Sequence, residues 1–199
     1  MKRILPSLLL TALLASLPLA AKAEWQAVEK VETYAVTGKS GLELYASIGE
    51  RGPLLGGKVR SIAHTSFKLT WQRDYQTRGT ACVLASARPK LIITTVLPRP
   101  ANGLPDPLRR NWETFVEGVH AHEKVHGEFI KDMVKEIEKA TIGLAVDDDP
   151  KCQKIRQKMQ PILGAISDAQ RQKSRDFDQV ELTNGGAVHQ LVLRLVNGG

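Results

Sequence analysis

The sequence predicts an α+β domain in which an N-terminal antiparallel sheet is followed by two long helices. Three observations support this prediction. Short runs of alternating or β-branched apolar residues fill residues 24–100. Apolar residues then recur at helical spacing over residues 108–140. A second helical pattern covers residues 150–175, after an acidic start with Pro150 at the first turn.

Within the sheet region, four runs predict strands, at residues 31–36, 67–71, 80–87 and 91–97. The polar stretch between the second and third runs ends at Gly79, which predicts a hairpin. Residues 41–48 predict a short helix that ends at Gly49.

The first long helix carries an apolar stripe over more than half of its length. Prolines between residues 98 and 107 end the sheet region just before it. The apolar residues of the stripe are Trp112, Phe115, Val116, Val119, Ile130, Met133, Val134 and Ile137. After the second helix, the apolar segment 188–196 is expected to return as a strand.

Residues 1–23 have the pattern of a secretory signal peptide. Lys2 and Arg3 form a basic start, residues 8–20 are apolar, and Ala21-Lys22-Ala23 is an A-x-A cleavage site. Cleavage near Ala23 is expected to leave residues 24–199 as a single domain. We therefore expect an exported protein without a membrane span, periplasmic or secreted, and assume a monomer.

Charge and cysteine content indicate which partners and which compartment to expect. The net charge is +7, but the basic residues are scattered and aromatic residues make up 5% of the chain, so no nucleic-acid partner is expected. The two cysteines, Cys82 and Cys152, are expected to form a disulfide, because export places a cysteine pair in an oxidising compartment.

The first long helix contains the sequence His122-Glu123-Lys124-Val125-His126, an H-E-x-x-H motif. Residues four apart lie on one face of a helix, so the two imidazoles can bind one Zn²⁺. Glu123 lies beside them, where a general base would act. The alternative is a pair of core histidines satisfied by hydrogen bonds. His120 points to another side of the helix.

A catalytic zinc site needs a third protein ligand, which the motif does not supply. Asp178 is the first candidate, because a carboxylate after the second helix could fold back onto the motif. Asp176 and His189 are the alternatives, and Asp178 could also be an ordinary solvated acid. The donor for a developing oxyanion could be Tyr34, Tyr75 or His120, and the spacing does not choose among them.

A sheet followed by a helix with H-E-x-x-H is also the layout of zincin metallopeptidases, in which an edge strand binds the substrate backbone. A series of residues along the chain also serves as landmarks for a family resemblance. They are Tyr34 with Val36-Thr37-Gly38, residues 71–75, Cys82, Leu97-Pro98, Trp112, Phe115, the motif, Cys152 and Phe177-Asp178. In these landmarks and their order, the chain resembles a bacterial exported family of unassigned function whose members are described as candidate secreted zinc-dependent proteases. The chain departs from the family pattern in its tail, where Asn184-Gly185-Gly186 replaces a His-Gly pair.

Together these features predict an exported zinc metallopeptidase that hydrolyses peptide bonds of a peptide or protein substrate. A zinc-activated water would attack, and Glu123 would be the general base. One alternative is a catalytically inactive zincin-like protein that binds a metal or a partner in the cell envelope. Another is a structural envelope protein whose histidines belong to the core.

Overall fold

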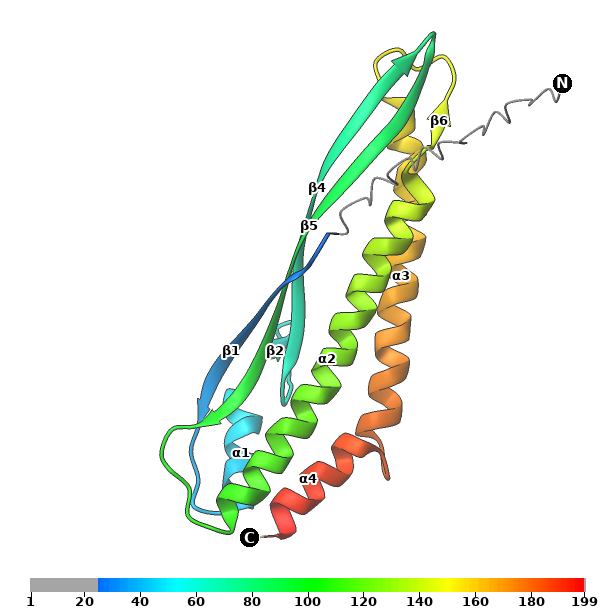
Figure 1. Cartoon of the computed structure of the whole chain (residues 1–199). Coiled ribbons are helices and arrows are strands. Elements are labelled where there is room, and N and C mark those ends of the chain that lie inside the picture. The colour runs from blue at the N-terminus through cyan, green and yellow to red at the C-terminus, as the bar shows by residue number, and fades with distance from the viewer. Residues whose placement is uncertain (1–24, 199) are drawn as a thin grey trace, which may run out of the picture.

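The structure is a computed structural model that describes residues 25–198, and the predicted signal peptide lies outside them. The molecule is elongated, with a long twisted sheet that runs beside two long helices (Figure 1). Among the described residues, no helix is both long enough and apolar enough to cross a membrane. The predicted mixture of a sheet and long helices is confirmed.

The main sheet has the strand order β1-β5-β4, formed by Val28–Val36, Ala81–Pro100 and His64–Arg78. A short strand, β6 (Ala145–Val146), pairs with the start of β5. The prediction of a wholly antiparallel sheet is wrong, because β1 runs parallel to β5. After β1 the chain passes through α1 (Gly41–Arg51) and reverses its direction in β4. β5 then runs in the same direction as β1 and lies between β1 and β4.

The predicted hairpin is confirmed, but its strands are longer than expected. β4 continues through the polar stretch to Arg78, and Gly79 forms the turn with a φ of 63°. The two runs at 80–87 and 91–97 form one strand that passes through Pro89. Pro89 is tolerated because β5 has only β4 as a neighbour there, since β6 pairs with Cys82 and Val83 and β1 pairs from Ile92 onward.

The first long helix, α2, spans Leu108–Thr141, as predicted to within one residue. The second, α3, spans Lys154–Leu182 and is therefore shifted toward the C-terminus of the predicted range. Its start is fixed by Asp149, whose carboxylate accepts hydrogen bonds from the backbone N–H groups of Gln153 and Ile155 at 2.8 and 2.9 Å.

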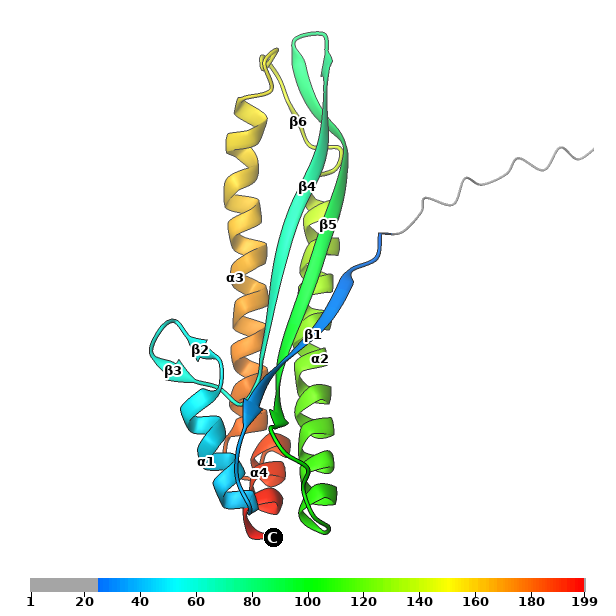
Figure 2. The same ribbon diagram turned by 90° about the vertical axis from the view of Figure 1, so that its left-hand side faces the viewer.

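The predicted tail strand is wrong, because these residues form the helix α4 (Ala187–Asn197). Val188 and Leu195 lie seven residues apart, on one helical face, and both are buried. α4 also lies very close to α1, since a Cβ atom added at Gly41 would clash with the Leu195 carbonyl oxygen. In both views α1 and α4 lie at the end of the molecule where β1 ends (Figures 1 and 2).

α2 and α3 pack against one face of the sheet. In the middle of the molecule, Leu91 and Ile93 of β5 contact a buried group on α2 that comprises Ile130, Met133, Val134 and Ile137. Another core cluster lies at the end with α1 and α4 and includes Val119. Between Val119 and Ile130, the buried side of α2 carries His122 and Glu123, which are polar.

Cys82 and Cys152 form the predicted disulfide, with an S–S distance of 2.06 Å. It joins β5 to the residues just before α3 and closes a separation of 70 residues. A disulfide that closes a loop of this length stabilises a fold by about 4 kcal/mol, because it lowers the conformational entropy of the unfolded chain.

Cys152→Ser is therefore expected to lower the free energy of unfolding by about 4 kcal/mol. Urea denaturation measures the loss, and a thiol titration of the unreduced, unfolded wild type that finds two thiols would contradict the disulfide.

Candidate metal centre

His122 and His126 lie one turn apart near the middle of α2 and project from the same face. Their Nε2 atoms are 3.1 Å apart, and their rings meet edge to face with centroids separated by 4.8 Å. Both are largely buried, with 6% and 12% of their side chains exposed. The helix therefore directs two imidazole nitrogens at one point.

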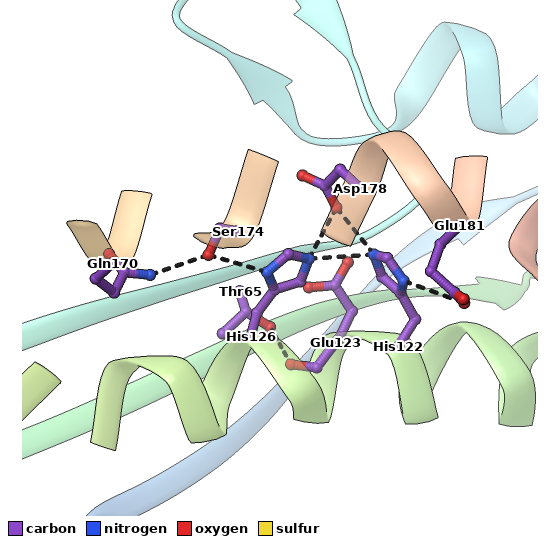
Figure 3. Close-up of polar contacts among 8 residues, drawn as sticks. All are labelled: Thr65, His122, Glu123, His126, Gln170, Ser174, Asp178 and Glu181. Atoms are coloured by element: carbon purple, nitrogen blue, oxygen red, sulfur yellow. Dashed lines mark hydrogen bonds and ion pairs between the residues drawn. The ribbon is translucent and has the colours of Figure 1, made fainter. Parts of the chain in front are cut away.

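Asp178 of α3 meets the two histidines across the interface between the helices (Figure 3). Its Oδ1 atom lies 3.1 Å from Nε2 of His122 and 2.9 Å from Nε2 of His126. These three side chains are the only group of at least three potential metal ligands found among residues 25–198, and their ligand atoms lie within 4.8 Å of one another. Asp178 is partly exposed, at 41% of its side chain, so the group is open on one side.

The spacing of these atoms fits a small divalent cation. Two atoms bound to one tetrahedral zinc at about 2.0–2.2 Å lie about 3.3–3.6 Å apart. The observed separations are slightly shorter, so only small shifts of the side chains would be needed. Two imidazole nitrogens and one carboxylate oxygen are also a ligand set that zinc prefers.

The other ring nitrogens face polar side chains from α3. Nδ1 of His126 lies 3.3 Å from the Ser174 hydroxyl, which accepts a hydrogen bond from Gln170. Nδ1 of His122 is buried without a hydrogen bond, and its neighbour is the Glu181 carboxylate at 3.9 Å. A proton on each Nδ1 would face these oxygens and leave both Nε2 lone pairs for a metal.

Phe177 holds the two imidazoles from the side of α3. Its ring stacks on His122 at 4.7 Å and meets His126 edge to face at 5.5 Å. Phe129 of α2 packs against Phe177 at 5.8 Å. These aromatic contacts restrict ring rotation, so the orientation of the histidines is set before any ligand binds.

The charges of the group are coupled. For His126, burial disfavours the proton, but the hydrogen bond and charge of Asp178, with the charge of Glu123, outweigh it and raise the pKa. For Asp178, burial opposes ionisation, but hydrogen bonds to His122 and His126 and their charges hold the pKa well below its ordinary value. Asp178 therefore stays an anion, which favours a cation beside it.

Glu123 lies next to the three-residue group without belonging to it. The residue is 6% exposed, and its carboxylate lies on the side of α2 that carries the imidazoles (Figure 3). Its backbone carbonyl accepts a hydrogen bond from the Thr65 hydroxyl of β4 at 3.3 Å, and Thr65 in turn contacts Thr95 of β5. These contacts tie the turn of α2 that carries Glu123 to the sheet.

A cleft of about 530 Å³ opens over these residues. Glu123 and all three residues of the group line it. β4, which lies at the edge of the sheet, forms the opposite wall through His64, Thr65 and Phe67. A molecule bound in the cleft would therefore lie between β4 and α2.

The alternative third ligands do not reach the group. Asp176 is exposed and accepts a hydrogen bond from Gln172 at 2.7 Å. His189 accepts a hydrogen bond from the backbone N–H of Gly185 at 3.3 Å, before α4. Of the sequence-predicted candidates, the structure brings Asp178 alone to His122 and His126.

None of the three predicted oxyanion donors lines the cleft. The Tyr34 hydroxyl donates a hydrogen bond to the carbonyl oxygen of Ile62 at 2.7 Å, and burial raises its pKa. The Tyr75 hydroxyl contacts the sulfur of Met159, in the core cluster around the disulfide. His120 is also absent from the cleft lining, whereas His64, which was not predicted as a site residue, is part of it.

Three α3 residues around the group, Gln170, Ser174 and Glu181, were not predicted from the sequence, whereas Asp178 was. Gln170, Ser174, Asp178 and Glu181 recur every three to four residues and so lie on one helical face. This spacing was available in the sequence, but the predicted helix ended at residue 175 and hid it.

The fold and the site define an α+β protein in which two long helices place a His–His–Asp group in a cleft beside an edge strand. The chain belongs to the family described as "Bacterial protein of unknown function (DUF922)", which matches residues 31–186. No curated protein and no protein of solved structure matches the chain. The family description assigns no activity, so the expected protease activity stays a prediction.

Proposed function

We propose that the protein is an exported, zinc-dependent peptidase of zincin-like organisation. The observation that carries the proposal is the convergence of His122, His126 and Asp178 in a cleft that also contains the buried Glu123. The proposal includes a single domain at residues 24–199, released by removal of residues 1–23. The disulfide supports export, because such bonds persist in oxidising compartments.

His122, His126 and Asp178 would hold the zinc ion, each through one atom. Zinc bound there would act as a Lewis acid that acidifies water and polarises a carbonyl group. Glu123 is placed to accept the proton of the attacking water and to deliver it to the leaving amine. Glu123 is 6% exposed, so its contact with bulk solvent is limited to the cleft.

The edge of the sheet would position the substrate. Among the described residues, β4 pairs only with β5, so its outer edge is available for pairing along the cleft. An extended peptide can add to such an edge through main-chain hydrogen bonds. This arrangement supports a peptide or protein substrate rather than a small metabolite, and it would place the scissile bond between β4 and Glu123.

The proposal is tested by metal analysis and peptide hydrolysis. Protein purified without chelator should contain about one zinc per chain and should cleave peptides from a mixed fluorogenic library. A chelator should abolish cleavage, and added zinc should restore it. Zinc without any cleavage would favour a binding protein, and absence of zinc from protein refolded in its presence would favour structural histidines.

Glu181 is expected to orient His122. Replacing Glu181 with Gln removes the charge that faces Nδ1 of His122 while keeping the side-chain shape. Because such partners fix the ring and raise its basicity, zinc affinity should fall by about 10–100-fold. Competition for zinc with a chromogenic chelator measures this loss of affinity. Glu136→Gln, an exposed change on α2, is the control, and equal affinities for all three proteins would refute this role.

A further inference from the structure

A small hairpin stands beside the cleft, formed by β2 (Leu54–Leu55) and β3 (Val59–Arg60). Its two strands pair only with each other, apart from the main sheet. Gly56 and Gly57 form its tip with positive φ angles, and a Cβ atom at either would meet nothing within 4 Å. Figure 2 shows the hairpin projecting from the body of the molecule next to α1.

The hairpin and its surroundings expose apolar side chains toward the cleft. Ten large hydrophobic residues are exposed among the described residues, and four of them line this cleft. They are Leu55, Val59, Phe67 and Leu182, with exposed fractions of 37%, 64%, 43% and 48%. Exposed apolar residues gathered at one cleft, rather than scattered, mark a binding surface.

The apolar wall of the cleft has few charged side chains, and Arg60, which belongs to the hairpin, is already hydrogen-bonded. The guanidinium of Arg60 donates a hydrogen bond to the carbonyl oxygen of Gly52 at 2.7 Å. Apart from Arg60 and His64, the titratable residues of the lining are Glu123 and the three-residue group of His122, His126 and Asp178. The wall made by the hairpin and Phe67 therefore offers a substrate side chain apolar contacts rather than an ion pair.

We infer that this wall is a specificity site for a large apolar side chain, such as Phe or Leu, next to the scissile bond. The inference rests on the proposed peptidase function. A peptide paired with the edge of β4 would pass Phe67 and the Glu123 region within the same cleft. A side chain directed at the hairpin would be covered by Leu55 and Val59. The cleft volume of about 530 Å³ lies within the range of ligand sites.

Two matched peptides that differ only in Phe or Ala next to the scissile bond test the inference. The wild type should cleave the Phe peptide with a kcat/KM about 10–100-fold higher, since apolar pockets discriminate by such factors. The double variant Leu55→Ser/Val59→Ser should lose most of this preference by slowing cleavage of the Phe peptide alone. Leu54→Ser is the matched control, because Leu54 is exposed on the same hairpin but does not line the cleft.

A binding measurement separates this inference from the proposed function. In a Glu123→Gln background, fluorescence anisotropy should show tighter binding of the Phe peptide, again dependent on Leu55 and Val59. Cleavage or binding without an apolar preference would overturn the specificity site and leave the peptidase function standing. Binding with the preference but no wild-type cleavage would overturn the peptidase function alone. Equal effects of Leu54→Ser and the double variant, or no peptide binding at all, would also overturn the specificity site.

Discussion

Replacing Glu123 with Gln is expected to abolish most peptide hydrolysis while leaving zinc content and fold unchanged. Glu123 is buried in the cleft beside His122 and His126 but lies outside the three-residue group, so zinc should bind without it. A Gln side chain cannot accept the proton of the attacking water. General bases contribute about 10²–10⁴-fold to a rate, and kcat should fall within this range. Steady-state kinetics with a fluorogenic peptide measures the loss.

The matched control is Glu117→Gln, an exposed change on the same helix that should leave kcat unaltered. Zinc content and thermal unfolding should agree for both variants and the wild type. A Glu123→Gln enzyme that hydrolyses peptide at the wild-type rate would show that another group acts as the base. A variant that loses its zinc would instead make Glu123 part of the metal site.

Replacing Asp178 with Ala is expected to weaken zinc binding by more than roughly 100-fold, since even partners outside the metal's ligands contribute about 10–100-fold. Asp178 contacts both Nε2 atoms and supplies the only carboxylate of the group. Its loss would leave two imidazoles, which hold zinc poorly. Zinc competition with a chromogenic chelator measures the change in affinity.

Asp176→Ala is the control for this experiment, because Asp176 lies two residues earlier in α3 but faces solvent. Both variants should keep the disulfide, so a thiol titration should find no free cysteine in either. Zinc affinity lowered by the Asp176 change and not by the Asp178 change would reverse the assignment of the third ligand.

The helical part of the fold follows from its sequence pattern. In α2 the apolar residues recur over many turns, and a long periodic signal fixes both the type and the extent of an element. The end of α3 could not be placed in the same way, because residues 168–176 are mostly polar and the stripe fades. That helix continues because Phe177 and Asp178 pack onto His122 and His126, contacts distant in the sequence.

Strand partners and the tail were harder to predict, for different reasons. The parallel pairing of β1 with β5 depends on the order in which strands enter the sheet, which alternation within a strand does not encode. Residues 188–196 are rich in Val and Leu, and local propensity favoured a strand. Burial of Val188 and Leu195 on one face favours a helix instead, so tertiary packing overrode the propensity.

The two histidines, Glu123 and the first-choice third ligand, Asp178, were all proposed from the sequence. The H-E-x-x-H spacing predicts one helical face for the two imidazoles and the position of a general base from chemistry alone. Ser174 and Glu181 were missed because the predicted helix ended at residue 175, so the face that they share with Asp178 was not recognised. His64 was missed because its place in the cleft depends on the packing of β4 against α2. The hairpin with Leu55 and Val59 was missed as well, since a short exposed hairpin leaves only a weak pattern.

The central claim, that His122, His126 and Asp178 hold zinc, is tested most directly by the zinc content of the purified protein. Mass spectrometric metal analysis of chelator-free wild type and of a folded His122→Ala/His126→Ala variant makes the comparison. The wild type should carry about one zinc per chain, and the double variant should carry almost none. Equal zinc in both proteins, or none in the wild type even after zinc is supplied, would contradict the claim.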